Sequence, residues 1–396
     1  MLDLQRLERI AACAQGYVDA GHYAGIEWQL QLGGMEYDRG VVGYADPDIG
    51  LPVPEHAIYR IYSMTKPVIA CMAMQLIEQG KLHLATPVAK ILPALGNLQI
   101  LQADGSLIPA RVPITIEHLL THRAGFTYDF LPECHVAGHY RDAAIATNGE
   151  RSLADFVTAL ASLPLAFEPG SAWRYSVSID VLAHVLECVT GTTLPELLQR
   201  LITDPLQMID TRFDVPAAKQ HRLMPMFGTR DLNGVMGITD ARQVLSALDV
   251  EHSYPSTTGS GFVRGGHGLF STTADYLSFM KLLSQGKNKD GDVMLSPATV
   301  DWMWANRIPA SQQPLVVGIN TIAGYGWNLF GRVMIDTGAA MKLTSHGEGG
   351  WAGAASTYFW VDRQRDFHGI VMTQYLGAQL PLADDMQTAA YQSLPA

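Results

Sequence analysis

Along the N-terminal part of the chain, hydrophobic positions change from a helical period to a strand-like one. Residues 4–20 mix charged and apolar side chains at helical spacing, which predicts an amphipathic helix. Residues 26–32 and 41–44 are then typical of short strands, with a turn region at Gly33 and Gly34 between them. The chain is therefore expected to begin with a helix followed by the first strands of a sheet.

The C-terminal part of the chain also has strand patterns, whereas the middle is mostly helical. Residues 356–361 and 367–374 are rich in aromatic and β-branched side chains, and 362–366 would form the turn of a β-hairpin. Residues from about 85 to 205 carry helical patterns broken by turns. We expect one α/β sheet domain built from both ends with a helical domain inserted into it, which divides the chain into 1–85 with 206–396, and 86–205.

Composition and charge narrow the class of protein. The 396 residues are 48% hydrophobic and 16% charged, which excludes an intrinsically disordered chain and allows a large core without a disulfide or metal. The net charge is 27 − 38 = −11, and only eight residues are lysine. Nucleic acids and anionic membranes require basic patches, so neither is an expected partner.

Cysteine usage and the N-terminus indicate a cytoplasmic protein. The cysteines lie more than fifty residues apart and form no metal-binding or disulfide-type spacing, being Cys13, Cys71, Cys134 and Cys188. The first residues lack the basic start, continuous apolar stretch and cleavage site of a signal peptide. The most apolar internal stretch, 68–77, has about half the length of a membrane span. The composition does not predict an oligomeric state.

One Ser-x-x-Lys tetrad, Ser63-Met64-Thr65-Lys66, stands where an apolar stretch at 58–62 changes to a helix that ends at Gly80. Pro67 has no N–H and would clash with the carbonyl four residues earlier, so the helix begins no earlier than about Ser63. Free N–H groups and the helix dipole favour negative charge there. Lys66 lies one turn further on the same face and can reach the Ser63 hydroxyl.

Two other Ser-x-x-Lys tetrads occur, at 278–281 and 284–287. The first falls inside the amphipathic run 274–283, away from a helix start. The second lies at the end of that run, just before Gly286, where the helix dipole has the opposite sign. Only Ser63 has the electrostatic environment of a nucleophile.

A lysine that acts as a base must be neutral part of the time, and burial and a second cation-stabilising or proton-carrying group are the usual means to that end. Tyr175 is the candidate for that group. It follows the tight turn at 168–171 and precedes an apolar helix at 179–189, so its hydroxyl can point into a cleft. A tyrosine at the edge of the core would have the same local pattern.

Five segments together resemble the serine β-lactamase-like superfamily, and within it the family VIII carboxylesterases, which are similar to class C β-lactamases. In chain order these are Ser63–Lys66, LLTHRAG at 119–125, FEPGSAWRYS at 167–176, GGHGLFSTTADY at 265–276 and Trp351-Ala352-Gly353. The resemblance covers about residues 20 to 375. It implies a β-lactamase/transpeptidase-like α/β (α+β) fold, in which an antiparallel sheet is flanked by helices, with a mostly helical inserted domain and the active site in the cleft between them.

The resemblance also implies roles for individual residues. Ser63 would be the acylated nucleophile and Lys66 the base that activates it. Tyr175 would carry a proton to the leaving alcohol and from the water that deacylates the enzyme. The backbone N–H groups of Ser63 and Ala354 would form the oxyanion hole.

Two departures from the β-lactamase pattern bear on the substrate. Where that pattern has Tyr-x-Asn, this chain has Tyr175-Ser176-Val177, and where it has Lys-Thr-Gly, this chain has Trp351-Ala352-Gly353. The missing lysine would hold a β-lactam carboxylate, whereas an indole suits an uncharged substrate, so Trp351 and Gly353 are expected at the substrate. An alternative register aligns Gly347-Glu348-Gly349 with Lys-Thr-Gly and places His346 near the site.

A metal-dependent hydrolase and an α/β-hydrolase are the alternatives from other classes of enzyme. His118 and His122 are spaced i,i+4, as are His135 and His139 beside Cys134, yet neither pair forms His-Glu-x-x-His. No Gly-x-Ser-x-Gly nucleophile elbow occurs in the chain. We therefore expect structural histidines, no metal and no cofactor.

The sequence predicts a serine hydrolase that cleaves short-chain, uncharged carboxylic esters through an acyl-serine intermediate. A small-molecule ester is its expected partner. Tyr128 and Trp327 are candidates for the pocket wall, although core aromatics would fit the same pattern. The alternatives are a β-lactamase or amidase with the same mechanism, and a catalytically inactive binding protein on the same fold.

Overall fold

One antiparallel sheet of eight strands organises the molecule. The computed structural model describes residues 4–145, 149–230, 232, 244–250, 263–378 and 380–395. The strands run in the order β11-β12-β13-β14-β15-β1-β2-β3. Their bounds are β1 Gly25–Leu32, β2 Met35–Asp46, β3 Leu51–Pro52, β11 Tyr325–Trp327, β12 Arg332–Met334, β13 Gly349–Gly353, β14 Thr357–Asp362 and β15 Phe367–Met372. Because β1 pairs with β15, both ends of the chain build one sheet, and the predicted fold class is confirmed.

Most of the strand predictions are confirmed, and one is wrong in its extent. The hairpin of β14 and β15 forms, with Asp362 opposite Phe367 across the predicted turn. The second strand was expected over 41–44, but β2 begins at Met35. Its first half is at most partly buried and carries charged side chains, and backbone pairing with β1 holds it there.

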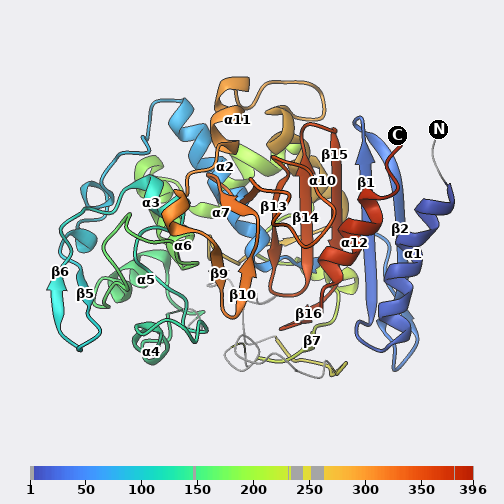
Figure 1. Ribbon diagram of the computed structural model, residues 1–396, viewed down its shortest axis with the longest axis horizontal. Helices are drawn as coiled ribbons and strands as arrows, with labels where there is room; N and C mark the ends of the chain where they lie inside the picture. The colour runs from blue at the N-terminus through green and yellow to red at the C-terminus, as the bar shows by residue number, and fades with distance from the viewer. Residues whose placement is uncertain are drawn as a thin grey trace.

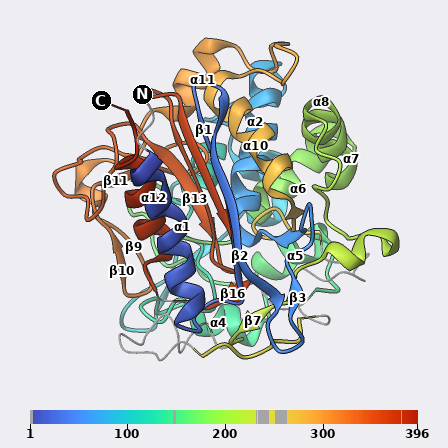
Figure 2. The same ribbon diagram turned by 90° about the vertical axis from the view of Figure 1, so that its right-hand side faces the viewer.

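Helices cover both faces of the sheet (Figures 1 and 2). The predicted N-terminal helix forms α1, Leu4–Asp19, which packs with α12, Leu382–Tyr391, over one face. On the other face lie α2, Thr65–Glu78, and α10, Thr273–Gln285, with α11, Pro297–Trp304, beside them. The sheet therefore has a hydrophobic core on each side, and α2 runs through the larger one.

The middle of the chain forms short helices on one side of the sheet, drawn in cyan to green in Figure 1. They are α3 Ile116–Leu120, α4 Ala137–Asp142, α5 Leu153–Leu160, α6 Ser178–Thr190, α7 Leu194–Leu198 and α8 Asp204–Leu206. A hairpin of β5, Gln99–Leu101, and β6, Leu107–Pro109, was not predicted. The limits of the inserted domain, 86–205, remain a prediction.

Short strand pairs also form outside the eight-stranded sheet. They are β4 Tyr59–Arg60 with β8 Phe270–Ser271, β7 Phe227–Gly228 with β16 Tyr375–Leu376, and β9 Leu315–Val317 with β10 Asn320–Ile322. Within the described ranges, no single helix has the length and apolar character needed to cross a membrane. One bent pair, Ser178–Thr190 with Leu194–Leu206, meets that test when its two helices are taken together.

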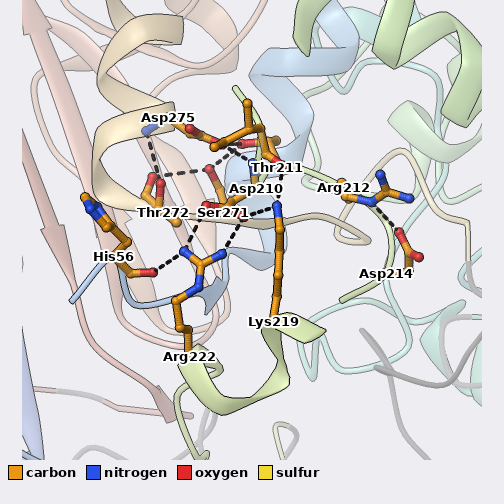
Figure 3. Close-up of polar contacts among 11 residues, drawn as sticks. His56, Asp210, Thr211, Arg212, Asp214, Lys219, Arg222, Ser271, Thr272 and Asp275 are labelled. Carbon is orange, nitrogen blue, oxygen red and sulfur yellow. Dashed lines mark hydrogen bonds and ion pairs between the residues drawn. The ribbon is translucent and has the colours of Figure 1, made fainter. Parts of the chain in front are cut away.

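An ion-pair cluster around Asp210 fixes the segment between α8 and β7 (Figure 3). Both terminal nitrogens of the Arg222 guanidinium, Nη2 and Nη1, donate to the Asp210 carboxylate at 2.7 and 2.9 Å, and Lys219 Nζ donates to it at 2.6 Å. The Asp210 backbone N–H donates to the Asp275 carboxylate at 2.8 Å, which connects this segment to α10. A bidentate pair of this kind is among the stronger polar contacts of a protein.

Asp210→Ala is expected to lower the free energy of unfolding by about 2 kcal/mol, because it leaves the half-buried Arg222 and Lys219 without a counter-ion. The matched control is Asp214→Ala, which breaks the exposed pair with Arg212 and should change stability by no more than about 0.5 kcal/mol. Urea unfolding followed by circular dichroism measures both variants. Equal effects for the two would show that the Asp210 cluster contributes nothing beyond a surface ion pair.

Candidate active site

Ser63 lies in a single 3₁₀ turn, Tyr62–Met64, immediately before α2 begins at Thr65. Tyr62 has φ +40°, a left-handed conformation that a non-glycine residue adopts only when its surroundings impose it. Strand β13 packs directly against this turn. A Cβ atom on Gly353 would come within 2.4 Å of the Ile61 carbonyl oxygen, so only glycine allows that approach.

Lys66 is buried and reaches Ser63 from the first turn of α2. A hydrogen bond of 3.1 Å joins Lys66 Nζ to Ser63 Oγ, and Nζ donates a second one, of 2.7 Å, to the Gly266 carbonyl. Nζ also lies 4.7 Å from the centre of the Tyr175 ring. Burial lowers the pKa of Lys66 to about 7, against the opposing effect of Asp180. A large fraction of Lys66 is therefore neutral near pH 7, as a base requires.

Tyr175 brings a second proton-carrying group to the same hydroxyl. It precedes α6, and its side chain is hydrogen-bonded to Ser63. The indole Nε1 of Trp351 donates to the Tyr175 hydroxyl oxygen at 3.0 Å. Burial raises the pKa of Tyr175, while the hydrogen bonds with Ser63 and Trp351 oppose that rise. Tyr175 is thus a neutral phenol whose oxygen already accepts one hydrogen bond.

Aromatic rings surround this cluster. Tyr128 lies 5.4 Å from Tyr175, centre to centre, and stacks on Phe130 at 4.8 Å. Trp327 contacts Trp351 edge to face at 4.6 Å. Trp327 is only 1% exposed, and its Nε1 donates to a backbone carbonyl, so it supports Trp351 from behind. Both predicted wall residues are therefore near Tyr175, but Trp327 lies one layer deeper than the prediction implied.

The structure brings Trp351, and not the alternative 347–349 segment, to Tyr175. Glu348 is buried and accepts hydrogen bonds from Tyr325 at 2.6 Å and from Thr344 at 3.0 Å. His346 is exposed on the loop before β13. Within the described part of the chain, no hydrogen bond or ring contact joins it to Ser63, Lys66 or Tyr175.

The paired histidines have partners other than a shared ion. His118 accepts a hydrogen bond from the Thr115 backbone N–H in the cap of α3. His122 is buried, with Nδ1 3.2 Å from Ser176 Oγ, and burial holds its pKa well below the ordinary value. His135 is bonded to a backbone carbonyl on β5. Among the residues that the structure describes, no three His, Cys, Asp or Glu side chains group as metal ligands.

One residue of the site, Asp180, was not predicted. It lies in α6, is fully buried, and its Oδ1 accepts a hydrogen bond of 2.9 Å from the Gly266 N–H. The sequence does contain a signal for it, because an acidic residue within the apolar run 179–189 is unusual unless it has a partner. That partner comes from the 265–268 turn, 86 positions further along the chain.

A family model described as Beta-lactamase matches residues 10–392. The chain belongs to this family. Protein Rv1367c of Mycobacterium tuberculosis is 32% identical over 352 residues, which are 84% of this chain and 81% of that protein. Esterase EstB of Burkholderia gladioli is 28% identical over 371 residues, 89% of this chain and 87% of that protein.

A solved structure matches this chain over almost its full length. The structure of EstCE1, described as a hydrolase with promiscuous acyltransferase activity, matches with a TM-score of 0.82 and 25% sequence identity. The match covers 98% of this chain and 99% of that one. The protein is a β-lactamase-fold serine hydrolase with esterase and acyltransferase relatives, and the resemblance seen in its motifs is confirmed.

Proposed function

We propose that this protein hydrolyses short-chain, uncharged carboxylic esters through an acyl-Ser63 intermediate. The observation that carries the proposal is the convergence of Lys66 and Tyr175 on the Ser63 hydroxyl, with the indole of Trp351 bonded to Tyr175. A nucleophile, a base with a lowered pKa and a protonated phenol are the groups that acyl transfer requires. Esterase EstB and EstCE1 support the same class of reaction.

In the first half-reaction, Lys66 Nζ accepts the Ser63 proton as Oγ bonds to the ester carbonyl carbon. The negative charge moves to the carbonyl oxygen, which the backbone N–H groups of Ser63 and Ala354 would stabilise. Tyr175 then gives a proton to the alcohol oxygen as the C–O bond breaks. In the second half-reaction water attacks the acyl-serine, and its proton passes through Tyr175 and Lys66 so that Ser63 leaves protonated.

Trp351 supports an uncharged substrate. An indole N–H is a donor without charge, and here it is already used by the Tyr175 hydroxyl, so it cannot neutralise a carboxylate. The hydrogen bonds of Tyr175 with Ser63 and with Trp351 both lower the pKa of the phenol, which favours release of its proton. Trp351 thus orients the proton carrier and gives the site an aromatic wall, 8% exposed.

The purified enzyme should hydrolyse p-nitrophenyl butyrate at least about 100-fold more efficiently, in kcat/KM, than it opens a chromogenic cephalosporin. The reason is the lack of a cationic group at the position of Trp351, since a charge-assisted hydrogen bond to a carboxylate contributes about 1.5–3 kcal/mol. Equal or better turnover of the cephalosporin would instead establish a β-lactamase. Adding a simple alcohol such as butanol measures acyl transfer, because the same acyl-enzyme serves water and alcohol.

A further inference from the structure

Asp180 is a buried carboxylate beside the proposed base that the reaction above does not use. Its residue is 0% exposed. Oδ1 accepts the Gly266 N–H, whereas Oδ2 is enclosed and receives no hydrogen bond from the described residues. Buried carboxylate oxygens are normally paired, because an unpaired buried charge costs several kcal/mol. A nearby cation must therefore offset the charge of Asp180.

The Gly266 peptide connects Asp180 to Lys66. Its N–H donates to Asp180 Oδ1 at 2.9 Å, and its carbonyl accepts from Lys66 Nζ at 2.7 Å. A carboxylate on the N–H side polarises the peptide and makes the carbonyl a stronger acceptor. The contact depends on glycine, since a Cβ at 266 would lie 2.5 Å from Asp180 Oδ2 and one at Gly265 would lie 2.6 Å from the Ile179 carbonyl.

The other charged and titratable groups that face Asp180 and Lys66 are an arginine, two histidines and two tyrosines. Burial raises the pKa of Asp180, while Lys66, the Gly266 N–H and then Arg264 oppose that rise. The Arg264 guanidinium lies over the Phe156 ring at 5.3 Å and donates to the Val263 carbonyl. His122 and His267 are buried, and burial together with Lys66 holds the pKa of both imidazoles well below the ordinary range. The rings of Tyr128 and Tyr175 cover the remaining side of Nζ.

We propose that Asp180 is a positioning residue for Lys66, acting through the Gly266 peptide and through its own charge. It holds Nζ at Ser63 Oγ and stabilises the ammonium that Lys66 becomes when it accepts the serine proton. The proton moves from Oγ to Nζ, and Asp180 remains a carboxylate throughout. The inference rests on the proposed acyl-serine mechanism and adds the group that balances the charge formed in its first step.

Asp180→Asn tests this role, because asparagine keeps an oxygen for the Gly266 N–H and removes only the charge. Without the carboxylate the protonated form of Lys66 is less favoured, so the pKa of Lys66 falls from about 7 to a lower value. The acid limb of kcat/KM for p-nitrophenyl butyrate should move about one unit to lower pH. The plateau should fall about tenfold, because a weaker base also gains less stabilisation as the ammonium forms.

The rate of Ser63 labelling by a fluorophosphonate, measured against pH, should show the same shift independently of the substrate. Asp180→Ser, which removes the charge with a smaller side chain, is expected to move the limb in the same direction. The matched control is Asp129→Asn, a buried carboxylate next to Tyr128 whose electrostatic partner is Arg141. That variant should leave the limb in place.

A limb that does not move in either Asp180 variant, or that moves to higher pH, overturns the inference even if activity falls. A shift of equal size in Asp129→Asn overturns it as well, because the effect would then be that of net charge. Failure of the proposed function is distinguishable from both outcomes. In that case the unmutated protein would not be labelled on Ser63, and no Ser63-dependent limb would exist to be moved.

Discussion

Ser63→Ala is expected to lower kcat for ester hydrolysis by at least about 10³-fold and to leave the fold intact. The hydroxyl lies at the surface of a turn whose backbone is fixed by neighbours, including the close contact of Gly353 with Ile61. Removing one oxygen there costs no core packing. Lys66 and Tyr175 would remain in place but would have no oxygen to activate. Steady-state rates with p-nitrophenyl butyrate measure the loss, and thermal unfolding confirms that the variant is folded.

Ser278→Ala is the matched control, since Ser278 heads a second Ser-x-x-Lys tetrad in the chain. It lies inside α10, and its hydroxyl donates to the carbonyl one turn earlier, as on any helix. Its loss should leave kcat unchanged. Intact mass spectrometry after fluorophosphonate treatment should show one adduct on the unmutated chain and on Ser278→Ala, and none on Ser63→Ala. No adduct on any of the three would favour an inactive binding protein.

The part of the site that could be predicted from sequence is the part that is local along the chain. Ser63 and Lys66 are one helical turn apart, so their proximity follows from the helix start that Pro67 indicates. Tyr175 stands at the start of α6 behind a tight turn, which the residues around it also indicate. In each case a few neighbouring residues determine where the side chain can point.

The rest of the site depends on contacts between distant segments. The pairing of Asp180 with Gly266 joins α6 to a turn 86 positions away, and no periodicity encodes it. Likewise, the sequence alone allowed two alignments for the strand beside Ser63, with either Trp351-Ala352-Gly353 or Gly347-Glu348-Gly349 at the position of Lys-Thr-Gly. Pairing of β13 with β14, which sets Trp351 opposite Phe359, turns the indole toward Tyr175. The first half of β2 was missed for a related reason, because backbone pairing with β1 and contacts with distant residues, such as Tyr37 with Ser393, hold it in place.

Lys66→Met is expected to remove activity and, at the same time, to stabilise the fold at neutral and acidic pH. General-base catalysis contributes about 10²–10⁴-fold, so kcat should fall by that factor. Lys66 is 1% exposed, and burial lowers its pKa from 10.5 to about 7. Folding the protonated chain therefore requires the loss of a proton from Lys66 or the burial of its charge. Methionine fills a similar volume without that cost.

The pH dependence follows from the direction of the shift. Between pH 7 and 10.5 the unfolded chain keeps a proton on Lys66 that the folded chain has released, so the stability of the unmutated protein rises with pH across this window. Below pH 7 the cost is fully present. The full shift would correspond to about 5 kcal/mol, and since the pKa of about 7 already includes the attraction of Asp180, most of it should appear as a gain in Lys66→Met at pH 6.

Urea unfolding at pH 6, 8 and 10 measures this difference, which should shrink steadily and fall within about 1 kcal/mol at pH 10. The control is Lys281→Met, from the tetrad on α10, which is expected to change neither kcat nor the pH dependence of stability. A stability difference for Lys66→Met that stays constant from pH 6 to 10 would mean that the amine keeps its ordinary pKa in the folded protein. Lys66 would then be an ammonium near pH 7, able to hold Ser63 by a hydrogen bond but unable to accept its proton, and the base would have to be sought elsewhere.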